Sequence, residues 1–552
     1  MAFDLQSFGD PDLHVDYLEH LVDHQSADTM ARLGRFWNYL RNELIPASGT
    51  AAAVMNSNSR PYFQAQEVGL PPRITGVSRL GSDLQNLTDL NRKEVVIEND
   101  IAWRVHTMID FLFGRSITVR SLASDPFMAL TIEQTLQAML EANGSVGFLQ
   151  EMALFGAVYG FVDIALRTPA DGPASHPTEP SGLAALPAAS PSTAGRPGTS
   201  TSNPEESGES ASSQDGPQGP DGDRSKLLAE RAVAAARSLH LETVEAPRVL
   251  PILDENDYRS IRYWVQRYHM PRARMSDARQ PWYAFGRIGR RNASPAVTEV
   301  VEIIGPSWWQ RYEDRQLVSQ GPNAMGRIPV VHIQNVAVPG AYEGLSDVEP
   351  LIPLQDELNT RLSDRANRVT YQSFKMYLGK GIDDFLERPV GPGQMWATQN
   401  LQASIEEFGN DDGSPSEDAH IEQVRQAMDK VSAVTPLAAG LIRGNVGNLT
   451  SGTALKVVLG GLLARTAKKR LAYGQGLQRV AELALEWLAL AGVLPTAPAD
   501  RRIEIHWPEP LPIDEGEQLR NAQIKAQLGI PTERIMSELG YGRDVIAESR
   551  TE

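Results

Sequence analysis

Gly326-Arg-Ile-Pro-Val-Val-His-Ile-Gln-Asn335 opens the stretch of sequence that decides the fold, and Gly344-Leu-Ser-Asp-Val-Glu-Pro-Leu-Ile-Pro-Leu-Gln-Asp-Glu-Leu-Asn359 follows it. The β-branched residues of the first segment predict a strand at residues 328–334. The second segment predicts the start of a helix, because proline is tolerated in a first helical turn. Large apolar residues then recur on one helix face: Leu351, Leu354, Leu358, Leu362, Ala366 and Val369.

Downstream, the sequence predicts two more helices with a loop between them. The first is amphipathic and ends before Pro436, with one apolar face formed by Ile421, Val424, Met428 and Val431. Residues 436–450 are rich in glycine and asparagine, which favours a loop. A long helix is expected from about Ser451 to Leu494, then a strand at 502–507 and a helical end.

Upstream, the N-terminal part is mainly helical. Helices are expected over 16–42, over 105–113 with Gly114 at its end, and over 132–155. A strand is expected after Gly114 and another at 156–166. The region after residue 225 is rich in β-branched and aromatic residues, which predicts strands at 261–268, 282–285, 297–304 and 308–313. Its aromatic residues are interpreted as sheet packing rather than as a surface for stacking nucleobases, because no basic stripe accompanies them.

Residues 168–225 differ abruptly in composition from the rest of the chain. They contain no aromatic residue, isoleucine, valine or methionine, and Pro, Ser, Gly and Ala dominate. Such a segment buries too little apolar surface to offset the entropy of ordering it. We therefore expect a disordered insertion that acts as a flexible linker.

Bulk composition limits the class of protein. At 552 residues the chain needs more than one folding unit. It has no cysteine, which excludes disulfides and thiolate chemistry and suits a reducing cytoplasm. The N-terminus lacks the features of a secretory signal, and the most apolar stretches carry charges, so no membrane association is expected. The formal net charge of −17 argues against tight non-specific binding to nucleic acid.

Together, the quoted segments resemble the portal proteins of tailed bacteriophages, of the type found in long-tailed siphophages. Ser363-Asp-Arg-Ala-Asn367 and Gly447-Asn-Leu-Thr-Ser-Gly-Thr-Ala-Leu-Lys456 add to the resemblance, as do the C-terminal segments 510–514 and 529–533. Residues 91–119 are similar to the N-terminal pattern of that family, with Ser116 where the family usually has proline. The matches follow the family's order over about three-fifths of the chain.

The resemblance implies an α+β portal fold with a mixed α/β wing, a helical stem, a small α/β clip and a mainly helical crown. The wing would span 1–345, including the insertion. Stem helices at 346–372 and 419–435 would flank the clip at 373–418. A tunnel loop at 436–450 would lead into the long helix 451–494, which joins wing and crown, and the crown would be 495–552.

The resemblance also implies a function. Such proteins form a homo-oligomeric ring, usually of twelve copies, at one capsid vertex of the virion, and assemble in the host bacterial cytoplasm. Double-stranded DNA passes through the channel during packaging and ejection, with weak, non-specific contacts. Implied partners are the large terminase, a head-completion or adaptor protein, and the major capsid and scaffold proteins. The terminase hydrolyses ATP, so the resemblance implies that the portal is not an enzyme and needs no catalytic residues, and it implies no cofactor.

Two groups of polar residues are candidates for contact with DNA. In the tunnel loop these are Arg443, Asn445, Asn448 and Thr450, which could touch phosphates transiently; the alternative is a plain connection between helices. A basic patch on the long helix consists of Arg465, Lys468, Lys469 and Arg470. Its alternatives are a salt-bridged face against a neighbouring subunit and a solvated face.

No motif supports catalysis or metal binding. The segment from Gly447 to Gly452 has the glycine spacing of a phosphate loop but lacks the lysine that should follow and a preceding strand. His20 and His24 lack the glutamate of a zinc-protease helix, and residues 410–418 lack the alternation of a calcium loop. The alternatives are a capsid-associated structural protein without a channel and a phage DNA-processing enzyme. An enzyme would require clustered carboxylates or a complete phosphate loop.

Overall fold

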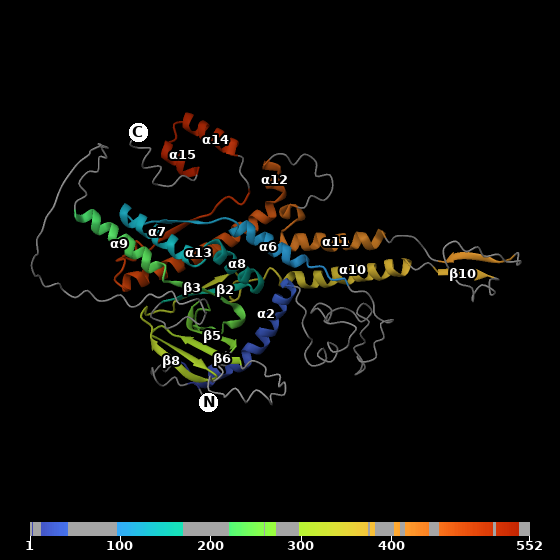
Figure 1. Cartoon of the computed structure of the whole chain (residues 1–552), viewed down its shortest axis with the longest axis horizontal. Coiled ribbons are helices and arrows are strands. Elements are labelled where there is room, and N and C mark those ends of the chain that lie inside the picture. The colour runs from blue at the N-terminus through green and yellow to red at the C-terminus, as the bar shows by residue number, and fades with distance from the viewer. Residues whose placement is uncertain are drawn as a thin grey trace, which may run out of the picture.

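The structure, a computed structural model, describes residues 3, 13–41, 96–168, 220–258, 260–271, 297–373, 376–380, 402–408, 415–440, 452–511 and 515–539. Helices and strands are both abundant, so the predicted α+β class is confirmed at that level. Figure 1 shows a mixed body from which one pair of helices projects, with a strand pair beyond its far end.

The body forms around a three-stranded antiparallel sheet with the order β3-β2-β9. Its strands are β2 (Phe161–Arg167), β3 (His240–Glu245) and β9 (Val330–Gln334). All but the last residue of β2 are buried, as expected for a central strand covered on both faces. Helix α8 (Val146–Tyr159) enters β2 through Gly160, whose φ of 93° favours glycine.

Helices surround this sheet and share one hydrophobic core with it. They are α2 (Ser26–Arg41), α6 (Asp100–Phe113), α7 (Pro126–Ala142), α8, α9 (Pro220–Ala236) and α13 (Gly460–Leu490). The long helix α13 approaches β9 very closely, because a Cβ on Gly476 would lie 2.3 Å from Cδ1 of Ile333. Strand β1 (Thr118–Ser121) pairs antiparallel with β12 (Ile503–His506), which attaches a C-terminal segment to the N-terminal half.

A second, five-stranded sheet has the order β4-β5-β6-β7-β8. Its strands are β4 (Ile252–Leu253), β5 (Ile261–Pro271), β6 (Val297–Ile304), β7 (Trp308–Glu313) and β8 (Gln316–Pro322). The N-terminal helix α1 (Val15–His20) and the π-helical turn η2 (Leu21–Gln25) provide apolar residues to the core of this sheet. Trp308 and Tyr312 are buried there, so their predicted packing role is confirmed.

The projecting pair consists of α10 (Ile352–Ser373), preceded by the 3-10 turn η8 (Glu349–Leu351), and α11 (Pro415–Ser432). The two helices lie side by side in opposite directions, and the antiparallel strands β10 (Met376–Lys380) and β11 (Ser404–Phe408) lie beyond their far end (Figure 1). After α11 come the 3-10 turn η10 (Pro436–Ala439) and α12 (Gly452–Val458). The C-terminal helices are α14 (Glu515–Gln527) and α15 (Thr532–Glu538).

Most predicted elements are present, with several differences. Residues 156–159, predicted as strand, end helix α8, and the helix predicted over 16–42 is interrupted by the π-helical turn η2. The helix expected over 132–155 is two helices, because Gly144 and Ser145 adopt positive φ angles of 95° and 50°. The helix expected over 451–494 is also two, α12 and α13. Strands β3, β4, β8, β10 and β11 were not predicted. Residues 220–225, expected to be disordered, begin α9, while 169–219 and the strand predicted at 282–285 lie outside the described residues.

Candidate functional site at the root of the helical pair

One extended segment, residues 96–100, binds the projecting helix α10 through a ladder of side chains. The backbone N–H groups of Val96, Glu98 and Asp100 donate to Ser363 Oγ (2.9 Å), Asn359 Oδ1 (3.0 Å) and Gln355 Oε1 (3.0 Å), respectively. Four residues of helix rise about 6 Å, and two residues of extended chain advance about 6.6 Å. Polar residues at every fourth helix position therefore match every second amide of the segment.

The same segment begins helix α6. Asn99 caps that helix, because its Oδ1 accepts from the N–H of Ala102 at 3.1 Å. Its Nδ2 donates to the carbonyl oxygen of Leu40 at 2.8 Å, at the end of α2. Thus α2, α6 and α10 meet at one point, and the polar ladder fixes their relative positions.

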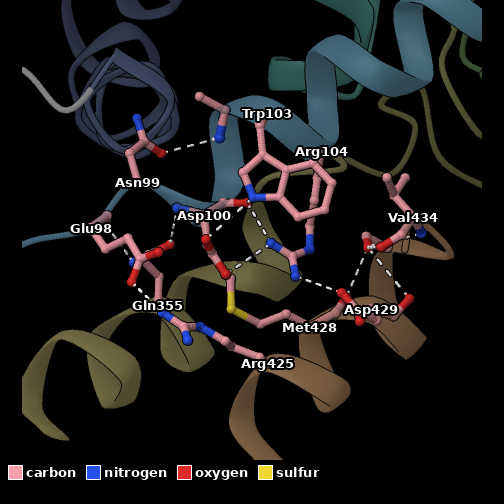
Figure 2. A network of polar contacts seen from close by, with 12 residues as sticks. Glu98, Asn99, Asp100, Trp103, Arg104, Gln355, Arg425, Met428, Asp429 and Val434 are labelled. Atoms are coloured by element: carbon pink, nitrogen blue, oxygen red, sulfur yellow. Dashed lines mark hydrogen bonds and ion pairs between the residues drawn. The ribbon is translucent and has the colours of Figure 1, made fainter. Parts of the chain in front are cut away.

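Arg104 connects α6 to α11 (Figure 2). Its Nη1 lies 3.0 Å from Asp100 Oδ2, and its Nη2 lies 2.6 Å from Asp429 Oδ1. The guanidinium is buried and lies over the ring of Trp103, 4.2 Å from its centroid. Burial raises the pKa of Asp429 and outweighs the opposite effect of Arg104.

Further ion pairs cross between the helices of the root. Arg425 Nη2 on α11 lies 2.6 Å from Glu98 Oε2. Along the pair itself, Arg365 of α10 contacts Asp418 of α11 at 3.1 Å, and Arg368 pairs with Glu417. The projecting pair is therefore tied to the body at its root and cross-linked by charges farther out.

The two flanks of the segment 441–451 lie close together beside this root. Val434, after α11, shares a small apolar cluster with Leu462 of α13 and Met108 of α6. Arg465 Nη1 donates to the carbonyl oxygen of Val431 at 2.7 Å. The loop candidates Arg443, Asn445 and Asn448, and Thr450, lie outside the described residues. The structure thus fixes where this segment leaves and re-enters the fold.

The four residues of the basic patch have different surroundings. Lys469 is buried and its ammonium pairs with Asp347, while also donating to Asn335 Oδ1 at 2.9 Å. Arg465 lies 2.7 Å from the second Asp347 oxygen. Arg470 donates to the carbonyl oxygen of Pro508 at 2.8 Å. Only Lys468 among the four is exposed, so the other charges act within the subunit.

Asp347 is the centre of this buried group. Burial by itself would raise its pKa, but the Lys469 ammonium and the Arg465 guanidinium hold that pKa below its ordinary value. Tyr473 Oη lies 3.2 Å from Asn335 Oδ1 and completes the group. These contacts join α13 to the segment between β9 and α10.

The sequence pattern alone did not identify Arg104, Asp429 or Asp347 as functional. A signal for Arg104 was available, because it lies on the same helix face as Ile101, Val105 and Met108, which are apolar. A lone arginine on a buried face requires a partner. For Asp347 and Lys469 no local signal exists, since 122 residues separate them.

Within the described parts of the chain, no group of three or more His, Cys, Asp or Glu residues has the arrangement needed to hold a metal ion. Among the described helices, none is both long and apolar enough to span a membrane. The arrangement at the root is therefore one of ion pairs and hydrogen bonds that connect helices.

Comparisons with known proteins add the following. The family model described as phage portal protein, SPP1 Gp6-like, matches residues 239–549. The chain is similar to a solved structure described as "Virion of native gene transfer agent (GTA) particle", with 11% identity, a TM-score of 0.39, and coverage of 80% of this chain and 90% of that chain. A second, "Neck of empty GTA particle computed with C6 symmetry", has 10% identity, a TM-score of 0.41 and the same coverages. Comparison with curated protein sequences found no match.

Proposed function

This chain belongs to the SPP1 Gp6-like family of phage portal proteins, and we propose that its copies form a ring around a channel for double-stranded DNA. The ring lies at one capsid vertex of the virion, where DNA enters during packaging and leaves during ejection. The observation that carries this proposal is the root of the α10–α11 pair. Buried ion pairs at this root hold the two projecting helices on the body, and the pair between Arg104 and Asp429 fixes α11 to α6.

The parts of the molecule receive the following proposed roles. The body is the wing, α10 and α11 are the stem, and the segment that includes β10 and β11 is the clip. Residues 436–450 are assigned to the tunnel loop, with Arg443, Asn445, Asn448 and Thr450 as the candidates for contact with DNA. Helix α13 joins the wing to the C-terminal crown. The contacts of Val434 with Leu462 and of Val431 with Arg465 support the loop assignment, because they bring the chain before and after this segment together.

Partners follow from these roles. The clip docks the large terminase during packaging and a head-completion protein afterwards, while the wing meets the capsid and scaffold proteins. Terminase supplies the energy by hydrolysing ATP, so the portal acts as a structural channel. The formal net charge of −17 per chain suits this task, because DNA slides past an acidic wall without a deep binding minimum.

A packaging assay tests the loop and channel roles together. Procapsids that carry Arg443→Ala portals should protect less DNA from nuclease than wild-type procapsids, while purified rings keep their mass. Arg237→Ala is the matched control, since Arg237 is exposed on the body and should leave packaging unchanged. If Arg443→Ala abolished ring formation, the segment would be structural. If packaging were unaffected by both changes, the loop would not contact DNA.

A further inference from the structure

Helix α13 has an exposed face that is unusual for a helix so deeply set in the body. Its buried face carries Leu462, Thr466, Lys469, Tyr473, Leu477 and Val480. On the opposite side, residues recurring every three or four positions are exposed: Ala464, Lys468, Leu471, Gln475 and Arg479. We call these five residues the outer face of α13.

Apolar and cationic groups alternate on the outer face without intramolecular partners. Leu471 is 66% exposed, and Val457, on α12 just before α13, is 76% exposed. Among the described residues, neither Lys468 nor Arg479 has a hydrogen-bond or ion-pair partner. By contrast, Arg465 and Lys469 on the same helix both pair with Asp347. The cations on the outer face therefore differ from those that face the body.

A cleft of about 660 Å³ borders this face. Gln475 and Arg479 line it from α13, and the loop at 337–342 lines it from the other side. A side chain of a partner that covers the outer face could enter this cleft between Gln475 and Arg479. An exposed leucine on a face that borders a hollow is typical of an interface rather than of an ordinary solvated surface.

We propose that the outer face of α13 is the surface on which a second copy of this chain docks. The occupant has to be apolar enough to cover Leu471 and acidic enough to pair with Lys468 and Arg479. This chain has 69 acidic and 52 basic residues, a formal net charge of −17, so a second copy can supply acidic partners for the two cations. Double-stranded DNA would pair with the two cations but would leave Leu471 in water, so the apolar residue favours protein.

The inference rests on the proposed ring and makes it more specific. Docking of this face against a different face of the next copy is a heterologous contact, and repetition of such a contact closes a ring when the rotation permits. Lys468 and Arg479 would then determine which face of the neighbour is accepted, since misdocked surfaces would leave the cations unpaired.

Native mass measurements on variants test the proposal. The Leu471→Glu variant should shift from oligomer to the 60.5 kDa monomer. The double variant Lys468→Glu and Arg479→Glu, which reverses both charges, should shift in the same way. Leu490→Glu is the matched control, because Leu490 is 60% exposed on the same helix but lies at its C-terminal end, beyond the outer face. Circular dichroism should show that all variants retain their helices.

A second measurement avoids any disruptive change. The chain has no cysteine, so Leu471→Cys and Leu490→Cys each introduce one labelling site. In the assembled protein a maleimide should label Cys at position 490 rapidly and that at 471 several-fold more slowly.

The outcomes separate this inference from the ring itself. The inference would be overturned, and the ring proposal left intact, if the wild-type protein formed rings, the Leu471→Glu variant still assembled, and a cysteine at position 471 were labelled freely. A wild-type protein that stayed monomeric at every concentration would overturn both. If charge reversal weakened binding to a DNA duplex without altering the mass, the face would belong to DNA, and the inference would be wrong.

Discussion

Lys469 holds a positive charge in the core of the protein, where an isolated charge is costly to bury. Its ammonium pairs with Asp347 and donates to Asn335, and Asp347 receives a second cation from Arg465. The group therefore has compensating charges and a nearly complete set of hydrogen bonds. Removal of one member leaves the other charges buried without a full set of partners. This uncompensated burial is the main loss of folding free energy that we expect.

Replacement of Lys469 by methionine should lower the free energy of unfolding by about 3 kcal/mol, at the low end for a broken buried pair because Arg465 still neutralises Asp347. Lys430→Met is the control, since Lys430 is exposed on α11, and a change within about 0.5 kcal/mol is expected there. Urea unfolding followed by tryptophan fluorescence measures both. Equal effects of the two changes would show that the buried pair contributes nothing.

The lowered pKa of Asp347 gives a pH dependence with a definite sign. Because its folded pKa lies below the ordinary value of 3.8, its contribution to stability is fully present above that value and is lost as pH falls through the folded pKa. The difference in unfolding free energy between wild type and Asp347→Asn should be constant from neutral pH to about pH 5 and should narrow in more acidic solution. A difference that widened on acidification would contradict the assigned direction.

At the scale of elements, the packing of α13 on β9 depends on a glycine. A Cβ on Gly476 would lie 2.3 Å and 2.4 Å from two side-chain carbons of Ile333, so the Ile333 side chain, the helix or the strand would have to move. Gly34 in α2 has no atom within 4 Å of the corresponding position. Substitution of Gly476 by alanine therefore reports the cost of overpacking, whereas substitution of Gly34 by alanine reports only the intrinsic effect of glycine on a helix.

Substitution of these glycines by alanine should change stability in opposite directions. Gly476→Ala should destabilise the protein by about 1–3 kcal/mol through overpacking. Gly34→Ala should stabilise it by about 0.5–1 kcal/mol, because alanine favours the helix and meets no neighbour. Thermal unfolding of the two variants provides the comparison. A stabilising Gly476→Ala would mean that α13 does not approach β9 as closely as described.

Elements with strong periodicity could be predicted from sequence, and those without it could not. The apolar stripe from Leu351 onward correctly located α10, because one helix face has to be buried whatever it packs against. Strand β8 reads Gln-Leu-Val-Ser-Gln-Gly-Pro and has no buried residue, so its alternation was too weak to detect. The break between α7 and α8 has a local signal in Asn143-Gly144, because this pair is typical of turns and Gly144 adopts a positive φ.

The candidate site was less accessible from sequence than the fold. Gln355, Asn359 and Ser363 belong to the segment that carries the family resemblance. Their physical role is to accept hydrogen bonds from the backbone of residues 96–100, which lie far away in the sequence. Likewise, the four cations of the basic patch are alike in sequence, but the fold buries Lys469 and leaves Lys468 exposed. Such differences depend on partners distant in sequence, which a local pattern does not contain.

At the scale of the whole molecule, a single chain leaves several surfaces without a covering partner. The α10–α11 pair projects from the body (Figure 1), and Leu519 and Ile524 are exposed on α14, with Leu528 exposed directly after it. Large apolar side chains exposed on extended elements are typical of proteins that assemble. A ring of copies would give these elements neighbours, and the acidic charge would keep free chains soluble before assembly.

The most direct test of the ring is the mass of the purified protein by light scattering, combined with negative-stain images of the same fraction. Closed rings with a central hole and a mass about twelve times the 60.5 kDa of one chain, or a neighbouring multiple, are predicted. Shells or open filaments, or a compact monomer that persists at high concentration, would contradict the account.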